Sequence, residues 1–138
     1  MSKILAVDDC SSTRAYLKKL GWKWNIEFVA VENGEDALAE LEKPDAPQIL
    51  LVDWVMPGMQ GDELIRHIRS QETDTLRYII MMTAKNKTED IEGAFAAGAD
   101  DYMIKPLDPN EIRARLGEGE RVLFRDQSIN EAFGQIGN

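Results

Sequence analysis

Residues 49–58 read ILLVDWVMPG, an apolar run that stops at one carboxylate and is followed by a bend. A short, uninterrupted apolar run is typical of a strand that is buried on both faces of a sheet. Pro57 and Gly58 favour a turn, because proline fixes one backbone angle and glycine accepts conformations that other residues avoid. The stretch therefore predicts a buried strand over residues 49–52, with Asp53 at its carboxyl end.

Four similar apolar runs occur elsewhere, and segments with helical spacing separate them. The predicted strands cover residues 4–7, 26–30, 49–52, 78–82 and 102–104. Apolar residues recur at helical intervals in the segments 11–20, 35–42, 62–69 and 88–97, and a fifth helix is expected from residue 108. Strands that alternate with helices indicate a parallel sheet with helices on both faces. The fold class is therefore α/β, while periodicity leaves the strand order open.

Residues suited to helix ends stand near most of the expected boundaries. Gly21 and Gly98 lie where a left-handed residue is needed to end a helix. Trp22 and Trp24 are then expected in the turn before the second strand. The candidate N-terminal caps are Ser11 or Ser12, Asn33, Thr88 and Asp108.

The composition is that of an ordinary globular protein, and 138 residues suit one domain. Hydrophobic residues make up 43% and charged residues 30%, a balance that argues against a fibrous or disordered chain. The formal net charge of −9 opposes non-specific attraction to nucleic acid or to an anionic membrane. We therefore expect no direct contact with nucleic acid or with a membrane.

The sequence has one cysteine, Cys10, and one histidine, His67. An intrachain disulfide and a zinc site built from Cys and His are both excluded by these counts. The N-terminus enters an apolar run without the pattern of a secretory signal, and no apolar stretch approaches the ~20 residues of a membrane span. We expect a protein of the reducing cytoplasm.

Charged and polar side chains follow four of the five predicted strands. In open parallel sheets, ligands bind outside the carboxyl ends of the strands. Each of these residues alone is also what a solvated loop or a turn contains, but the fold brings all of them to one edge. We therefore predict a functional site at this edge. Its residues are Asp8 and Asp9 after the first strand, Asp53 after the third, Thr83 after the fourth and Lys105 after the fifth.

Electrostatics indicates what such a cluster binds. Two carboxylates ~4 Å apart repel by about 4 kcal/mol at an effective dielectric near 20, so three of them need a cation in their midst. Oxygen ligands without His or Cys favour a hard cation, and Mg²⁺ (or Mn²⁺) suits a small cluster that leaves room for a phosphate oxygen. Lys105 and Thr83 then fit an anion that arrives with the metal. Phosphoryl transfer depends mainly on positioning and charge neutralisation, and a carboxylate can be its nucleophile.

Four stretches stand in order along the chain: VDDCSSTR, LLVDWVMPGMQGDELIRHIR, MMTAK and GADDYMIKPLD. Together they resemble the receiver domains of bacterial response regulators in two-component signalling, from about residue 3 to residue 117. The resemblance implies a flavodoxin-like, doubly wound five-stranded parallel sheet in the order 2-1-3-4-5 with five helices. It also implies a phosphorylation-dependent switch that catalyses only its own phosphorylation and dephosphorylation, rather than an enzyme with other substrates.

The resemblance assigns a role to each acidic residue. Asp53 would accept a phosphoryl group from a phosphohistidine on a histidine kinase or a phosphotransfer protein. Asp9, Asp53 and the backbone carbonyl of Val55 would ligate Mg²⁺ directly, and Asp8 would act mainly through water. Val55 and Lys85 stand at positions that tune the lifetime of the acyl phosphate, and the apolar Val55 predicts slow hydrolysis because it positions no attacking water.

The resemblance also implies how phosphorylation is transmitted. Lys105 would pair with a phosphoryl oxygen, and the peptide bond between Lys105 and Pro106 would be cis. The hydroxyl of Thr83 would move toward the phosphoryl group, and Tyr102 would turn inward behind it. The fourth helix, fifth strand and fifth helix would then present a changed surface to an output domain, a target protein or a second copy in a phosphorylation-dependent homodimer.

We predict a receiver domain over residues 1–117, followed over residues 118–138 by a helical extension or linker. Gly117 and Gly119 weaken the helix at this boundary by ~1 kcal/mol each relative to alanine. The phrase EIRARLGEGERVLF nevertheless resembles the fifth helix and linker of receivers fused to output domains. Two arrangements stay open: the N-terminal part of a longer protein, or a receiver with a docking tail.

Three other functions are alternatives. A phosphohydrolase of the haloacid dehalogenase type also uses an aspartyl nucleophile on a parallel sheet, but its second Asp would stand where Cys10 does. A flavin-binding module on the same topology needs a phosphate-binding loop after the first strand, which this sequence lacks. A pseudo-receiver would only bind partners, whereas every residue of the phosphorylation set is present here.

Overall fold

The computed structural model describes residues 3–71 and 75–137, with side chains up to residue 129. Five parallel strands form one sheet in the order β2-β1-β3-β4-β5, which confirms the predicted doubly wound α/β fold. The strands are β1 (Lys3–Val7), β2 (Glu27–Val31), β3 (Ile49–Asp53), β4 (Tyr78–Thr83) and β5 (Asp101–Ile104). The helices are α1 (Ser11–Trp24), α2 (Gly34–Leu41), α3 (Gly61–Ser70), α4 (Thr88–Ala97) and α5 (Pro109–Gly137).

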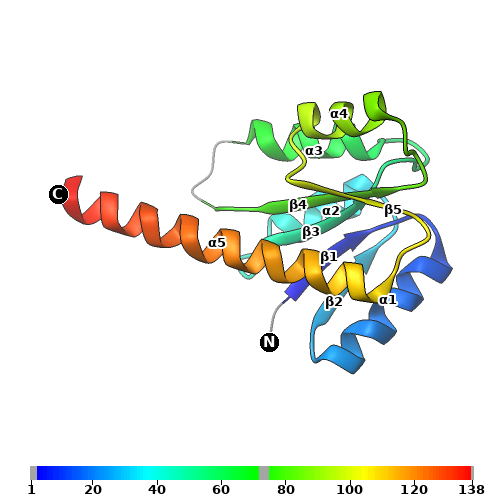
Figure 1. Ribbon diagram of the computed structural model, residues 1–138, viewed down its shortest axis with the longest axis horizontal. Coiled ribbons are helices and arrows are strands. Elements are labelled where there is room, and N and C mark those ends of the chain that lie inside the picture. Colours follow the sequence, from blue (N-terminus) through cyan, green and yellow to red (C-terminus); the bar gives the residue numbers. More distant parts are fainter. Residues whose placement is uncertain (1–2, 72–74, 138) are drawn as a thin grey trace.

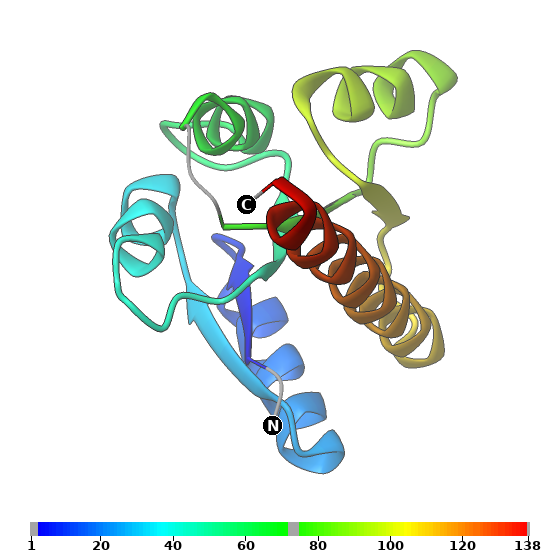
Figure 2. The ribbon, with the colours of Figure 1, turned by 90° about the vertical axis from the view of Figure 1, so that its left-hand side faces the viewer.

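The sheet is a central layer between two groups of helices (Figure 2). Helices α1 and α5 pack on one face, where Leu17 and Ile112 belong to one buried cluster. Helices α2, α3 and α4 pack on the other face, where Leu64 and Ala94 belong to a second cluster. Strands β3 and β4 are buried along their whole length because both of their faces are covered. This burial explains their uninterrupted apolar sequences.

Several predicted helix boundaries are confirmed and others are wrong. The side chains of Asn33 and Asp108 cap α2 and α5, each accepting a hydrogen bond from the backbone N–H three residues on, at 2.7 and 3.0 Å. Gly98 ends α4 with a φ of 116°. Cys10 and Lys87 precede α1 and α4 without a side-chain capping bond, so the caps predicted there lie inside the helices. Those residues are Ser11, Ser12 and Thr88.

Helix α1 continues past its predicted end. Asn25, with a φ of 58°, ends it in the left-handed conformation, so the prediction for Gly21 was wrong. Gly21 lies inside the helix, where an added Cβ would come within 2.6 Å of the Ile26 carbonyl oxygen. Trp22 and Trp24 therefore belong to the last turn of α1 and not to the following turn. Glycine at residue 21 therefore lets the chain pass close to α1 as it turns into β2.

Helix α5 is continuous from Pro109 to Gly137 and extends well beyond the sheet (Figure 1). Ile112 and Leu116 bury its first part. Gly119 lies against the ring of Tyr78, where a Cβ would be 2.8 Å from a ring carbon. The helix thus crosses residue 117 without a break. No helix in the described part of the chain is both long and apolar enough to cross a membrane.

Gly61 brings the start of α3 into contact with the end of β3. Its N–H donates a hydrogen bond to the carbonyl oxygen of Trp54 at 2.8 Å. An added Cβ would meet the Asp53 carbonyl oxygen at 2.2 Å and the Trp54 Cα at 2.8 Å. Both neighbours are backbone atoms, which cannot rotate away. The absence of a side chain at residue 61 therefore helps to fix the backbone of Asp53.

We expect Gly61→Ala to destabilise the protein, because the methyl group must displace the β3 backbone. Overpacking of this kind costs about 1–3 kcal/mol in the free energy of unfolding, which urea denaturation measures. Gly117→Ala is the matched control, since a Cβ there meets nothing within 4 Å. The control should be neutral, or stabilising by up to about 1 kcal/mol because alanine favours a helix. Equal effects of the two substitutions would contradict this account.

Candidate functional site

The register of the sheet places the predicted site residues at one edge. The last pair in the register of β1 and β3 comes directly before Asp8 and Asp53. These two residues are therefore nearly level at the strand ends. Thr83 is the last residue of β4, and the backbone N–H of Lys105 donates to its carbonyl oxygen at 2.8 Å. Asp9 follows Asp8 in the loop before α1. The structure therefore brings together all five residues that the sequence placed at this edge.

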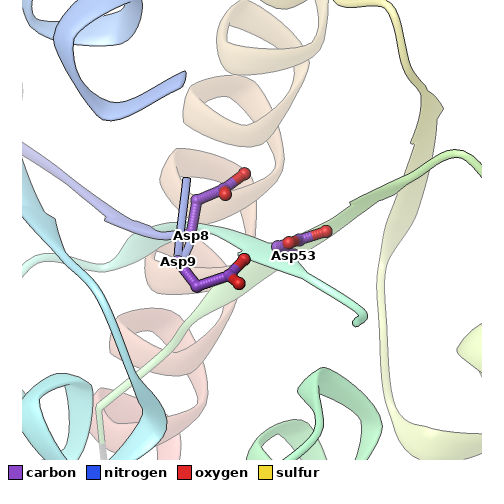
Figure 3. Close-up of side chains that lie close together, drawn as sticks. All are labelled: Asp8, Asp9 and Asp53. Carbon is purple, nitrogen blue, oxygen red and sulfur yellow. The ribbon is translucent and has the colours of Figure 1, made fainter. Parts of the chain in front are cut away.

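Asp8, Asp9 and Asp53 form a compact carboxylate cluster (Figure 3). One oxygen from each lies within 4.8 Å of the other two. Asp8 is fully buried and Asp53 is 6% exposed, whereas Asp9 is exposed. Buried carboxylates need a compensating charge, and all-oxygen donors at this spacing suit a hard divalent cation. The cluster thus fits Mg²⁺ or Mn²⁺ and leaves an open side at Asp9.

Lys105 supplies positive charge to the cluster from the loop after β5. Its ammonium lies 2.8 Å from Oδ2 of Asp8 and 3.4 Å from Oδ1 of Asp53. Burial alone would lower the pKa of Lys105, but the hydrogen bond to Asp8 and the charge of Asp53 outweigh it and raise that pKa. Lys105 therefore stays protonated. The bond between Lys105 and Pro106 is cis, as predicted.

Asp8 is held by contacts on both sides. Its Oδ1 accepts a hydrogen bond from the Cys10 N–H at 2.8 Å, while Oδ2 faces Lys105. The guanidinium of Arg14 donates to the Asp8 carbonyl oxygen at 2.8 Å. Sequence reasoning gave Arg14 no role, because its distance along the chain from Asp8 carries no recognisable spacing. Asp8 is thus a fixed acid, while Asp53 makes the longer contact with Lys105.

The acidity of Asp53 reports the charge balance of the site. Burial, and then the negative charge of Asp8, raise the pKa of Asp53 from its ordinary value near 3.8 to about 6, although Lys105 acts in the opposite direction. One ammonium therefore does not neutralise the cluster. A divalent cation beside Asp53 would remove this deficit, which is an independent reason why the residues fit a metal ion.

Thr83 and Tyr102 meet at the backbone of Lys85. Thr83 is 2% exposed, and its Oγ1 accepts a hydrogen bond from the Lys85 N–H at 3.3 Å. Tyr102 is turned inward, and its hydroxyl donates to the Lys85 carbonyl oxygen. The Lys85 ammonium lies 4.3 Å from the centre of the Trp54 ring. Sequence reasoning did not connect Lys85 with Trp54, since nothing in a pattern links these two loops.

Val55 is 54% exposed, in contrast to its buried neighbours Asp53 and Trp54. Its side chain has no group that could hold a water molecule by a hydrogen bond. Metal binding by its backbone carbonyl stays a prediction.

The fold and the acidic cluster are those of a known family. Residues 4–117 match the response regulator receiver domain. The chain belongs to this family. Receiver domains act in two-component systems as phosphoacceptor switches rather than as enzymes, and response regulators interact with histidine kinases and output domains. Receiver domains bind Mg²⁺ at an acidic pocket, and here Asp8, Asp9 and Asp53 form such a cluster.

Relatives of this receiver domain include both longer and shorter proteins. It is 37% identical over 132 residues to the transcriptional regulatory protein ResD of Bacillus subtilis, covering 96% of this chain and 52% of ResD. It is 31% identical to a chemotaxis protein CheY homolog of Campylobacter jejuni, and the match covers 83% of this chain and 88% of that protein. The structure of Vibrio cholerae CheY4 superposes with a TM-score of 0.79 at 28% identity, covering 86% and 98%. The chain spans about half the length of the transcriptional regulators it matches.

We expect Asp53→Asn to stabilise the metal-free receiver at high pH. A raised folded-state pKa means that the folded protein binds the Asp53 proton more tightly than the unfolded chain does. Stability therefore falls as pH rises from about 4 through about 6, and the cost is fully present above 6. Two pH units correspond to roughly 3 kcal/mol, an upper limit for the gain at pH 8.

Urea unfolding in EDTA at pH 8 and pH 4 measures the effect, which should be small at pH 4. Asp126→Asn is the control, because it removes one negative charge outside the cluster. At pH 8, Mg²⁺ should reduce the difference in unfolding free energy between Asp53→Asn and the wild type. The wild type alone keeps all three carboxylates, so it should be stabilised more by the metal ion. An equal gain from Asp126→Asn would mean that net charge, and not the cluster, sets the stability.

Proposed function

We propose that this receiver domain is a switch in which Asp53 accepts a phosphoryl group in a Mg²⁺-dependent reaction. The observation that carries the proposal is that Asp53 lies beside both an acidic pair and an ammonium. One of its oxygens is within 4.8 Å of an oxygen of Asp8 and of Asp9, and Lys105 lies 3.4 Å from Oδ1 of Asp53. A nucleophile, a metal site and an anion partner thus share one edge of the sheet.

In the proposed reaction an oxygen of Asp53 attacks the phosphorus of a phosphohistidine on a histidine kinase or phosphotransfer protein. The new O–P bond makes an acyl phosphate, the P–N bond breaks, and the imidazole nitrogen leaves with the electron pair. Asp53 must be ionised to attack, which its pKa of about 6 allows at neutral pH. Such donors supply their phosphoryl group in the cytoplasm, where we place this protein.

Mg²⁺, when bound, neutralises the charge of the phosphoryl oxygens and of the carboxylates that surround them. Asp9, Asp53 and the Val55 carbonyl would be direct ligands, and Asp8 would act mainly through water. Lys105 would turn its ammonium from Asp8 and Asp53 toward a phosphoryl oxygen on Asp53, whose Oδ1 lies 3.4 Å from that ammonium in the unphosphorylated protein. Mn²⁺ has the same preference for oxygen ligands and would substitute for Mg²⁺.

Phosphorylation would be transmitted through Thr83 and Tyr102. The Thr83 hydroxyl accepts from the Lys85 N–H and would turn to donate to a phosphoryl oxygen. Tyr102, which was predicted to turn inward on phosphorylation, is already inward in this structure and would be held there. The surface of α4, β5 and α5 would then favour an output domain, a target protein or a second copy of the receiver. Phe95 on α4 and Ile104 on β5 are large apolar residues exposed on this surface, at 46% and 40%. Residues 118–138 would be the helical extension or linker toward an output domain.

The alternative is a phosphohydrolase of the haloacid dehalogenase type with Asp8 as nucleophile. The contacts favour Asp53, because both oxygens of Asp8 are engaged, by the Cys10 N–H and by Lys105. A phosphohydrolase would also release phosphate continuously instead of stopping after one phosphoryl group per chain.

We expect acetyl phosphate with Mg²⁺ to add one phosphoryl group to the wild type, detected by intact-mass spectrometry and located on Asp53 by peptide mapping. Asp53→Asn should add none. Asp62→Asn is the matched control on α3, where Asp62 pairs with Arg66, and it should react like the wild type. EDTA should stop the reaction and Mn²⁺ should restore it. Labelling of Asp8 with steady phosphate release would overturn the proposal in favour of the phosphohydrolase.

We also expect the acyl phosphate to persist beyond seconds, because the apolar Val55 side chain positions no attacking water. Val55→Gln, which introduces an amide able to hold water, should shorten the lifetime, whereas Val55→Leu should not. The decay of the phosphorylated mass after removal of the donor measures this. A wild type that loses its phosphoryl group within seconds would show the inference from Val55 to be wrong.

A further inference from the structure

Lys85 uses three of its chemical groups to contact three different parts of the receiver. Its N–H donates to Thr83 at the end of β4, and its carbonyl oxygen accepts from Tyr102 on β5. Its ammonium lies over the ring of Trp54, which directly follows Asp53. One loop residue therefore joins the segments that carry the phosphoacceptor, the hydroxyl and the inward tyrosine.

The ring of Trp54 is a fixed platform for this ammonium. Trp54 is 9% exposed and belongs to the buried cluster under α2, α3 and α4. Its backbone N–H donates to the Met82 carbonyl oxygen at 3.2 Å, and its ring lies 3.5 Å from the position of a Cβ at Gly93 on α4. The residue is thus held by β3, β4 and α4 together. A cation resting on its ring is held relative to all three elements.

The loop that contains Lys85 has little else to fix its position. Residues 84–87 are exposed, and among the described side chains no carboxylate forms an ion pair with the Lys85 ammonium. An exposed lysine normally extends into water, because ordering its long side chain costs conformational entropy. The contact with the electron-rich face of Trp54 is therefore the interaction that orders this side chain.

We propose that Lys85 is a positioning residue of the switch, whose ammonium on Trp54 holds the backbone of residue 85 where it meets both Thr83 and Tyr102. This proposal rests on the proposed function of Asp53 as phosphoacceptor. The contact favours the inward position of Tyr102 before phosphorylation. Tyr102 then already occupies the position that it is expected to have in the phosphorylated state. The phosphoryl group therefore needs to contribute less free energy to shift the tyrosine from outward to inward.

The size of the effect depends on the strength of the contact. Exposed cation–π contacts shift a two-state equilibrium by about two- to fivefold. Removing the ammonium should therefore lower the ratio of inward to outward Tyr102 by that factor. Lys85→Met removes the charge and keeps a side chain of similar length. Lys85→Arg keeps a cation that can stack on Trp54.

The resting position of Tyr102 can be measured without any ligand, by ¹⁹F NMR of protein labelled with 3-fluorotyrosine. Tyr102→Phe identifies the signal among those of the three tyrosines. In Lys85→Met the signal should move toward that of an outward, solvated ring, whereas Lys85→Arg should match the wild type. Lys87→Met is the matched control, a lysine in the same exposed loop for which no ring contact is present among the described side chains.

The second readout is the affinity for beryllofluoride, a phosphoryl analogue, in the presence of Mg²⁺. Lys85→Met should bind it about two- to fivefold more weakly, while Lys85→Arg and Lys87→Met should bind like the wild type. An unchanged Tyr102 signal in Lys85→Met, or the same change in Lys87→Met, would overturn the role of Lys85. Failure of the wild type to bind beryllofluoride would instead count against Asp53 as phosphoacceptor, and the ligand-free Tyr102 signal would still decide the role of Lys85.

Discussion

The close packing of three carboxylates at one edge of a parallel sheet is the constraint on which the rest of this receiver depends. Parallel strands end at one level, so residues that come after β1 and β3 must lie side by side. Burial makes the repulsion between Asp8 and Asp53 stronger than it would be in water. Lys105 offsets part of it, yet the pKa of Asp53 remains raised to about 6. The folded chain thus keeps a site at which the binding of a cation lowers the free energy.

The surrounding structure keeps this unfavourable arrangement from relaxing. The N–H of Cys10 and the guanidinium of Arg14 hold the loop that carries Asp8 and Asp9. Gly61 lets α3 begin directly against the Asp53 backbone. These contacts hold the chain at the strand ends, so the carboxylates cannot separate without disrupting a strand end. The repulsion between the carboxylates therefore persists until a cation binds. It lowers the stability of the fold, but the two buried clusters of the core stabilise the fold by more than this.

Periodicity and strand ends could be predicted from the sequence, whereas features that depend on tertiary contacts could not. Uninterrupted apolar runs located all five strands, and the polar residues that follow four of them located the site. The predicted end of α1 was wrong because Gly21 does not end the helix; it is there because the Ile26 carbonyl oxygen comes too close for a side chain. In a sequence, a glycine required by such a contact cannot be told from a glycine that ends a helix. The contact between Lys85 and Trp54 joins two loops that meet only in the folded chain. Strand order and residue roles needed the family resemblance, since alternation alone allows several topologies.

The same sheet is connected mechanically to the C-terminal helix. Tyr78 on β4 places its ring against Gly119 of α5, and its hydroxyl lies 3.4 Å from a carboxylate oxygen of Asp101 on β5. Arg115 of α5 pairs with the same carboxylate at 3.1 Å. Burial, and then the charge of Asp101, raise the pKa of Tyr78 to about 12, so this hydroxyl stays protonated and able to donate.

Two contacts therefore join α5 to β4 and β5, at Arg115 and Gly119, and a third joins β4 to β5. Beyond them the helix runs on without a break. A continuous helix transmits a displacement at one end to the other, because its hydrogen bonds resist bending. Asp101 is adjacent to Tyr102, so the ion pair with Arg115 connects α5 to the strand that carries the tyrosine. Gly119 is then needed at the point where the helix must stay in contact with the sheet, although helix propensity disfavours glycine there. That conflict between local preference and close packing explains why the sequence suggests a weak helix where the structure has its longest one.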